Sequence, residues 1–170
     1  MMTMFEESGM VFSFPEEDIY RIEKSKFLAS VQMKACECIV KKDNNILLVE
    51  AKSSSPHPDK SAERFHQFIE EIKKKFSDSL LFYNVMLLRQ KEQGIGENLQ
   101  STDLKEAKYQ FVLIIKGHKK GWLPPLSDAL KKEMRSILRL WNIEDVAVKV
   151  VNEEIATTSS ILGNHITIDS

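Results

Sequence analysis

Hydrophobic positions recur along the chain at two different spacings, which predict strands and helices. The clearest strand pair consists of residues 34–41 and 46–52, two β-rich runs separated by Asp43-Asn44-Asn45. Because aspartate and asparagine tolerate left-handed turn conformations, this segment predicts a β-hairpin. Shorter apolar or alternating runs predict further strands at residues 11–14, 109–115, 146–151 and 165–168.

Two longer stretches have apolar residues at helical spacing. The first helix is expected to start near Ala62, and residues 80–88 are apolar enough to continue it beyond a candidate break at Ser77-Asp78-Ser79. The second helix is expected to begin at Ser127, a good N-cap residue, with Asp128 at the favourable end of the helix dipole. The remaining segments predict a weak helix at residues 153–162 and loops at residues 53–59, 94–101 and 116–125.

These elements together predict one α/β domain over residues 1–170, with a mixed central β-sheet flanked by helices. The length matches one domain of roughly 100–200 residues, and 42% hydrophobic residues argue against disorder. The longest apolar runs fall far short of the roughly 18 residues that a membrane helix needs, so no membrane partner is expected. An acidic N-terminus, where a secretory signal carries Lys or Arg, and only two cysteines, Cys36 and Cys38, favour a reducing, cytoplasmic location.

Positive charge is locally concentrated in a chain that is nearly neutral as a whole. The formal net charge is −1, so binding to nucleic acid would depend on a local basic patch that contacts phosphates. Lys131, Arg135 and Arg139 are spaced by four residues opposite the apolar stripe of the second helix, where a solvated helix face is the alternative interpretation. Further basic candidates crowd the preceding loop: Lys116, His118, Lys119 and Lys120.

The predicted hairpin carries the residues most suited to chemistry. A two-residue turn at Asp43-Asn44 pairs position 42 with 45 and therefore Glu37 with Glu50, so that the two carboxylates lie opposite each other. With a turn at Asn44-Asn45, Glu37 faces Lys52 instead. In both registers the strand period of two leaves all three charged side chains on one face. The second strand is apolar on both faces up to Glu50, as is typical of a strand inside a covered sheet.

The pairing of Glu37 with Glu50 has an electrostatic cost that a cation would relieve. Two adjacent carboxylates repel each other, and burial increases the cost of their charges. Lys52 supplies one positive charge, and Mg²⁺ or Mn²⁺, which carboxylate oxygens suit, would supply the rest and retain waters able to act as nucleophiles. An ion pair on an edge strand is the plainer alternative for Glu-x-Lys. Lys73-Lys74-Lys75, on the first helix, is expected to balance Glu70-Glu71 through helical pairing.

Glu37, the turn and the run Leu47-Leu48-Val49-Glu50-Ala51-Lys52-Ser53 resemble the restriction-endonuclease-like, or PD-(D/E)XK, nucleases. The signature of that family is an acidic residue on one strand followed by Asp/Glu-x-Lys on the next. The resemblance covers about residues 20–67 and implies a restriction-endonuclease-like fold. It also implies that Glu37 and Glu50 bind magnesium and that Lys52 orients or activates the attacking water. Glu23 is the candidate for the upstream helical acid of the family, and a surface salt bridge is the alternative for it.

Two functions from different classes follow from these patterns. The first is a magnesium-dependent nuclease that hydrolyses phosphodiesters in nucleic acid, which the intact trio of two acids and a lysine favours. The second is a non-catalytic binding or scaffold module of the same fold, which the near-neutral charge favours. In the family the first acid is usually Asp preceded by Pro, whereas here Glu37 follows Cys36. The sequence leaves open whether the nucleic acid would be DNA or RNA.

Overall fold

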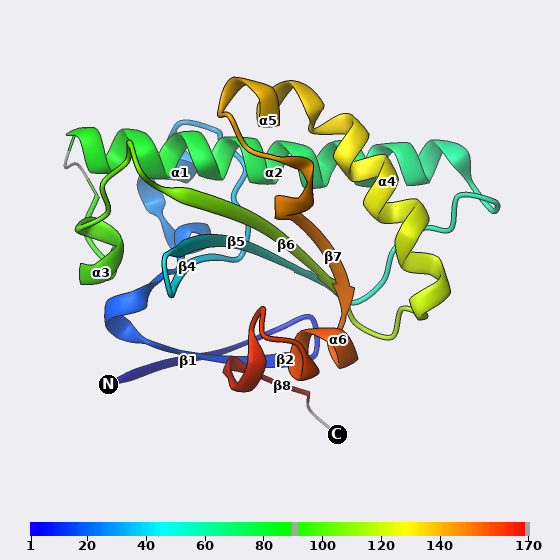
Figure 1. Cartoon of the computed structure of the whole chain (residues 1–170), viewed down its shortest axis with the longest axis horizontal. Coiled ribbons are helices and arrows are strands. Elements are labelled where there is room, and N and C mark those ends of the chain that lie inside the picture. Colours follow the sequence, from blue (N-terminus) through cyan, green and yellow to red (C-terminus); the bar gives the residue numbers. More distant parts are fainter. Residues whose placement is uncertain (90–91, 169–170) are drawn as a thin grey trace.

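The computed structural model describes residues 1–89 and 92–168 and consists of two β-sheets with helices around them. A five-stranded mixed sheet forms the middle layer. Helices cover one of its faces, and a three-stranded antiparallel sheet lies against the other (Figure 1). The predicted fold class, α/β with a mixed central sheet flanked by helices, is thereby confirmed. The restriction-endonuclease-like fold stays a prediction.

The middle sheet changes from antiparallel to parallel pairing along its width. In spatial order it contains β3 (Ile19–Tyr20), β4 (Cys38–Lys42), β5 (Asn45–Lys52), β6 (Lys108–Ile115) and β7 (Val148–Asn152). β4 is antiparallel to β3 and β5, whereas β5, β6 and β7 run parallel to one another. β5 and β6 lie inside the sheet and are covered on both faces, which explains their almost uninterrupted apolar sequences.

The connection between the parallel strands β5 and β6 is the long helix α2 (Ala62–Arg89). It starts at the predicted residue, and its buried positions recur every three or four residues against the middle sheet. The candidate break at Ser77-Asp78-Ser79 is wrong, because the helix runs through it without interruption. These three polar residues lie on the helix without ending it.

Two of these polar residues organise the segment that precedes β4. Ser79 is buried, and its Oγ accepts a hydrogen bond from the Cys36 backbone N–H at 2.8 Å. Asp78 Oδ2 accepts one from the Lys34 N–H at 2.8 Å. Because side chains of α2 satisfy these backbone donors, residues 34–36 need no strand partner, and β4 begins only at Cys38. The predicted strand over residues 34–41 is therefore shorter than expected.

The connection between β6 and β7 contains α4 (Leu123–Glu133) and α5 (Arg135–Leu140), with a turn at Met134. The expected start at Ser127 is wrong, because α4 begins four residues earlier. Its first turn contains Pro124 and Pro125, whose missing N–H groups cost nothing where a helix has no acceptor for them. Sequence patterns suggested one helix here, whereas the structure has two.

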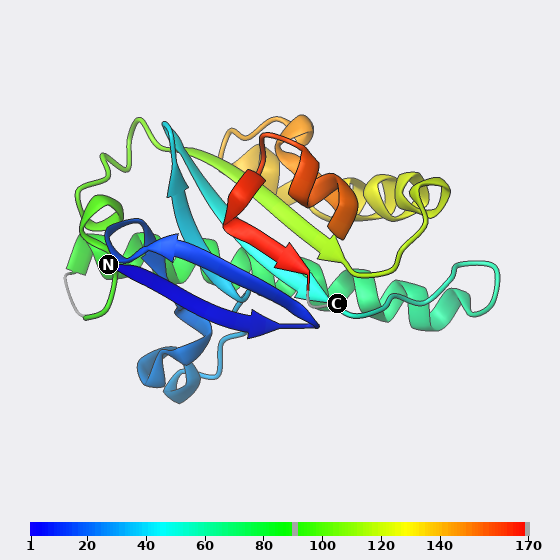
Figure 2. The ribbon, with the colours of Figure 1, turned by 90° about the horizontal axis from the view of Figure 1, so that it is seen from below.

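The other face of the middle sheet packs on a second apolar core. Figure 2 shows this side, where the three-stranded sheet crosses the middle sheet. The sequence predicted strands at residues 11–14 and 165–168 but not the first strand of the chain. The elements on this side are β1 (Met2–Glu7), β2 (Met10–Pro15), β8 (Ile166–Ile168) and α6 (Glu153–Thr158).

Short helices complete the chain. The expected polar loop at residues 94–101 contains α3 (Glu97–Gln100), whose Leu99 is fully buried. Among the described residues, no helix has both the length and the apolar character needed to cross a membrane. The other short helices are α1 (Lys26–Ser30) and single 3-10 turns at Glu16–Asp18, Ile22–Lys24, Lys120–Trp122, Asp145–Ala147 and Gly163–His165.

Candidate metal centre

The register of the β4–β5 hairpin brings Glu37 next to Glu50. The strands pair Lys42 with Asn45 and Cys38 with Val49, as expected for a two-residue turn at Asp43-Asn44. Asp43 has a φ of 54°, in the left-handed region that such a turn requires. The Glu37 N–H donates to the Val49 carbonyl at 2.9 Å, so Glu37 and Cys38 both face Val49 and the regular ladder ends at the Cys38–Val49 pair. Of the two registers considered from sequence, the first is the observed one.

Glu50 is completely buried on the face of β5 that α2 covers. Ile46 and Leu48, four and two residues earlier, belong to the core under α2. The ion-pair partner of Glu50 is Lys75 of α2, whose Nζ lies 3.1 Å from Oε2 and 3.2 Å from Oε1. Lys52, two residues further along β5, has its Nζ 3.2 Å from Oε1 of Glu71 instead.

The expected pairing of the three consecutive lysines of α2 with Glu70-Glu71 is therefore wrong. Lys73 pairs with Glu133 of α4, Lys74 pairs with Asp78, and Lys75 turns toward the sheet. Helical spacing predicts only partners on the same helix, whereas this face of α2 packs on β5 and α4. Lys75 is thus a site residue that the sequence analysis missed, because its partner is 25 positions away.

Glu37 is the central carboxyl of the cluster, with 8% of its surface exposed. Burial, followed by hydrogen bonds to the carboxylates of Glu50 and Glu23, raises its pKa to about 10, so it is protonated at neutral pH. Burial alone would raise the pKa of Glu23, but hydrogen bonds with Glu37 and Arg21 lower it. Burial raises the pKa of Glu50, although Glu37 and the Lys75 ammonium oppose this. The protonated carboxyl of Glu37 thus lies between the carboxylates of Glu23 and Glu50 and adds no third negative charge.

A fourth acid, Glu7, approaches the cluster from the other sheet. Carboxylate oxygens of Glu7, Glu23 and Glu37 lie within 4.8 Å of one another. Glu7 ends β1, and the turn that follows is held against the middle sheet by a hydrogen bond from Ser8 Oγ to the Ala51 carbonyl at 3.1 Å. No local sequence signal identifies Glu7 as a site residue, because its position depends on packing between two sheets.

This donor set fits a hard divalent cation. Its potential ligands are carboxylate oxygens from three separate elements, the kind that Mg²⁺ and Mn²⁺ prefer. Glu50 Oε2 is buried, and apart from its ionic contact with Lys75 it has no conventional hydrogen-bond donor among the described residues. It can therefore accept the Glu37 proton or bind a cation. A cation that displaced this proton would be bound by the carboxylates of both Glu37 and Glu50.

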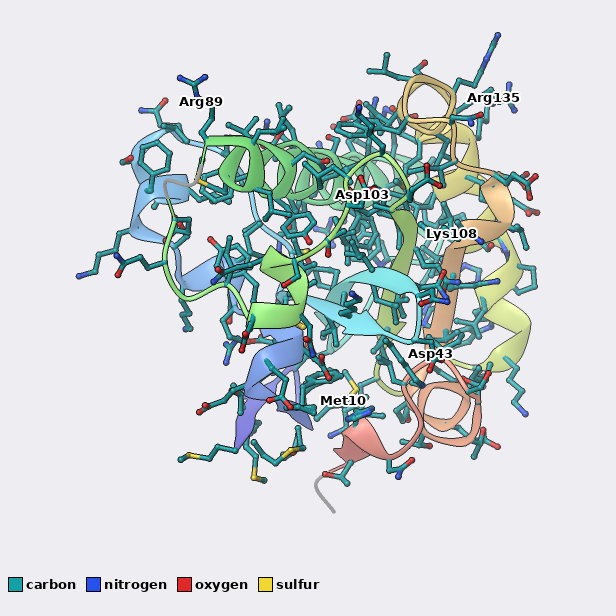
Figure 3. All side chains as sticks on the ribbon, turned by 60° about the vertical axis from the view of Figure 1, so that its left-hand side comes forward. Met10, Asp43, Arg89, Asp103, Lys108 and Arg135 are labelled. Atoms are coloured by element: carbon teal, nitrogen blue, oxygen red, sulfur yellow. The ribbon has the colours of Figure 1, made fainter. Side chains whose placement is uncertain are left out.

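The basic candidates form two separate groups. Lys131, Arg135 and Arg139 line one surface hollow of about 320 Å³, but they belong to α4 and α5 and not to one helix. Figure 3 shows Arg135 on the outside of the helical layer. Lys119 lies over the ring of Trp122 at 5.0 Å, and Lys120 lies 3.7 Å from Glu154. Of the two groups, the second lies just after the carboxyl end of β6, beside the carboxyl end of β5, whose last residue is Lys52.

Comparisons with known proteins leave the family open. A scan against family models finds no match to this chain, and searches of curated proteins and of solved structures find none either. The resemblance to restriction-endonuclease-like nucleases stays a prediction that rests on Glu37, Glu50 and Lys52. Function has to be inferred from the geometry of the site.

Proposed function

We propose that this chain is a magnesium- or manganese-dependent nuclease that hydrolyses phosphodiester bonds in nucleic acid. The observation that carries the proposal is the position of Glu50, a completely buried carboxylate within hydrogen-bond reach of the Glu37 carboxyl. Burying charge in a core costs several kcal/mol unless it is compensated. Lys75 compensates the charge of Glu50, but apolar residues at both positions would avoid burying any charge, and binding of a cation would account for the acid.

The residues take the following parts in this proposal. Glu37 and Glu50 hold the cation, and Glu23 completes the acidic wall from the turn after β3. A bound divalent cation polarises the phosphate and makes water a better nucleophile. Lys52 lies at the end of β5, where its ammonium can contact a phosphate oxygen or orient water. Lys75 holds the carboxylate of Glu50 in place through its ion pair and is a positioning residue.

Calorimetric titration with Mg²⁺ and Mn²⁺, combined with a cleavage assay on labelled DNA and RNA, tests this function. The wild-type protein should bind the cation and cleave only when it is present. Glu37→Gln should lose both properties while remaining folded, because glutamine keeps the hydrogen bonds of the protonated acid. Glu106→Gln is the matched control, since Glu106 is exposed in the turn before β6, and it should behave as wild type. Wild-type protein that binds neither cation would overturn the proposal.

The ion pairs support a second candidate, a non-catalytic binding or scaffold module. Lys75 compensates Glu50 and Glu71 compensates Lys52, so the cluster is largely neutralised by the chain itself. In a scaffold these groups would form a polar core, and a partner would perform the chemistry. Nucleic-acid binding that persists without divalent cations and without cleavage would favour this candidate.

A further inference from the structure

A second hollow lies beyond the carboxyl ends of β5 and β6. It has a volume of about 480 Å³ and lies between the loop that follows β5 and the loop that precedes α4. A volume of a few hundred Å³ is typical of sites for small organic groups. Its walls include His57, Asp59, Lys60, Arg64, His118 and Trp122.

Aromatic rings form one wall of this hollow. Trp122 is 41% exposed, which is unusual for the largest apolar side chain. The rings of His57 and His118 stand edge-on to it, with centroids 5.6 Å and 5.3 Å away. Burial lowers the pKa of His118, so this imidazole is neutral at pH 7. The edge contacts hold the indole while part of it stays open to solvent.

Cations outnumber the acid, Asp59, among the described residues that line the hollow. Lys60 and Arg64 are exposed at the rim, and neither forms an ion pair with any residue in the described ranges. Lys119 Nζ lies 5.0 Å from the centre of the Trp122 ring. A stacking surface bordered by unpaired cations matches a planar base attached to an anionic phosphate.

We propose that this hollow binds an unpaired nucleotide of a single-stranded segment, with the base stacked on Trp122 and the adjoining phosphates on Lys60 and Arg64. The inference rests on the proposed nuclease function and specifies its substrate class. An unpaired nucleotide is required because bases inside a duplex already stack on both faces, whereas a single strand can present a free face to an aromatic side chain.

Helix geometry gives the separation between this hollow and the acidic cluster. Arg64 precedes Glu71, the partner of Lys52, by seven residues of α2, and precedes Lys75 by eleven. At 1.5 Å per residue these separations are about 10 and 16 Å along the helix axis. A stacked strand rises about 3.4 Å per nucleotide along its axis and an extended one rises more, so cleavage is expected within about five nucleotides of the anchored base.

Fluorescence anisotropy with labelled oligonucleotides in EDTA tests this site without any metal. Single-stranded DNA and RNA should bind more tightly than a blunt duplex of the same sequence. Trp122→Ala should weaken single-strand binding at least about fivefold, the low end of measured stacking contributions. Phe27→Ala is the matched control, because Phe27 is also 41% exposed but lies on α1, and it should leave the affinity unchanged.

The charge contribution is tested with a Lys60→Gln/Arg64→Gln double variant. It should reduce the slope of log affinity against log salt by about 0.7 for each phosphate that the two cations no longer neutralise. Four results would each overturn the proposed site. They are an unchanged salt slope in the double variant, equal binding of duplex and single strand, equal effects of Trp122→Ala and Phe27→Ala, and undetectable binding by the wild type. Trp122-dependent binding without cleavage in Mg²⁺ would support the pocket and refute the nuclease. Cleavage with an unaltered cut position in Trp122→Ala would refute the pocket alone.

Discussion

Replacing Glu37 with glutamine separates the electrostatic cost of the acidic cluster from its packing. Glutamine has nearly the same shape as a protonated glutamate, and its amide can donate hydrogen bonds to the carboxylates of both Glu23 and Glu50. It cannot ionise. The substitution therefore imposes permanently the neutral state that Glu37 adopts in the folded protein without metal.

The expected effect follows from the pKa of Glu37, which rises from its ordinary value of 4.5 to about 10 on folding. A group with a raised pKa binds its proton more tightly in the folded state. Its contribution to stability is complete below pH 4.5 and is lost as the pH rises toward 10. The loss is about 1.4 kcal/mol per pH unit, or about 3 kcal/mol at pH 7. Glu37→Gln should therefore match wild type near pH 4.5 and be more stable by up to this amount at pH 7.

Urea unfolding followed by circular dichroism, at several pH values between 4.5 and 8 in EDTA, measures this difference. Glu106→Gln, the exposed control, should show the same pH dependence as wild type. Adding Mg²⁺ should stabilise wild type by about 1.4 kcal/mol at ten times the dissociation constant and leave Glu37→Gln unaffected. Equal destabilisation of Glu37→Gln at pH 5 and pH 8 would refute the reasoning, because Glu37 would then act through packing or as an anion.

Two other substitutions test the charges around the cluster. Glu50→Gln should destabilise the fold by about 3 kcal/mol in urea unfolding, because it leaves the partly buried ammonium of Lys75 without its partner; a gain in stability would contradict this ion pair. Simultaneous reversal to glutamate of Lys131, Arg135 and Arg139 should weaken nucleic-acid binding for all sequences and lower its salt dependence, while the urea midpoint stays constant. Unchanged anisotropy titrations would exclude that surface from the substrate path.

Local patterns predicted those parts of the fold that depend on neighbours in sequence. The turn at Asp43-Asn44 determined the hairpin register, because a two-residue loop allows only one pairing of the flanking strands. The apolar spacing located the start of α2 at Ala62. The start of α4 was missed because Ser127 is a good cap by composition, whereas the prolines before it already occupy the first helical turn.

The candidate site was predictable only where it lies on the hairpin. Glu37, Glu50 and Lys52 belong to one pair of neighbouring strands. The two-residue period of a strand and the register of the hairpin therefore predict that they lie close together. Lys75 and Glu7 join the cluster through packing of α2 and of β1 against the middle sheet. Neither contact has a spacing that could be read from one sequence, because tertiary packing selects which face of an amphipathic element meets which strand.

The two lysine pairs differ in how readily a substrate could open them. Lys52 is one quarter exposed and pairs with Glu71, which is more than half exposed, so breaking this pair costs at most about 1 kcal/mol. The pair between Lys75 and Glu50 involves a carboxylate without any exposure and costs several kcal/mol to separate. A phosphate can therefore displace Glu71 from Lys52 while Lys75 continues to hold Glu50. In the proposed nuclease, Lys52 would therefore contact the substrate while Lys75 keeps Glu50 in place.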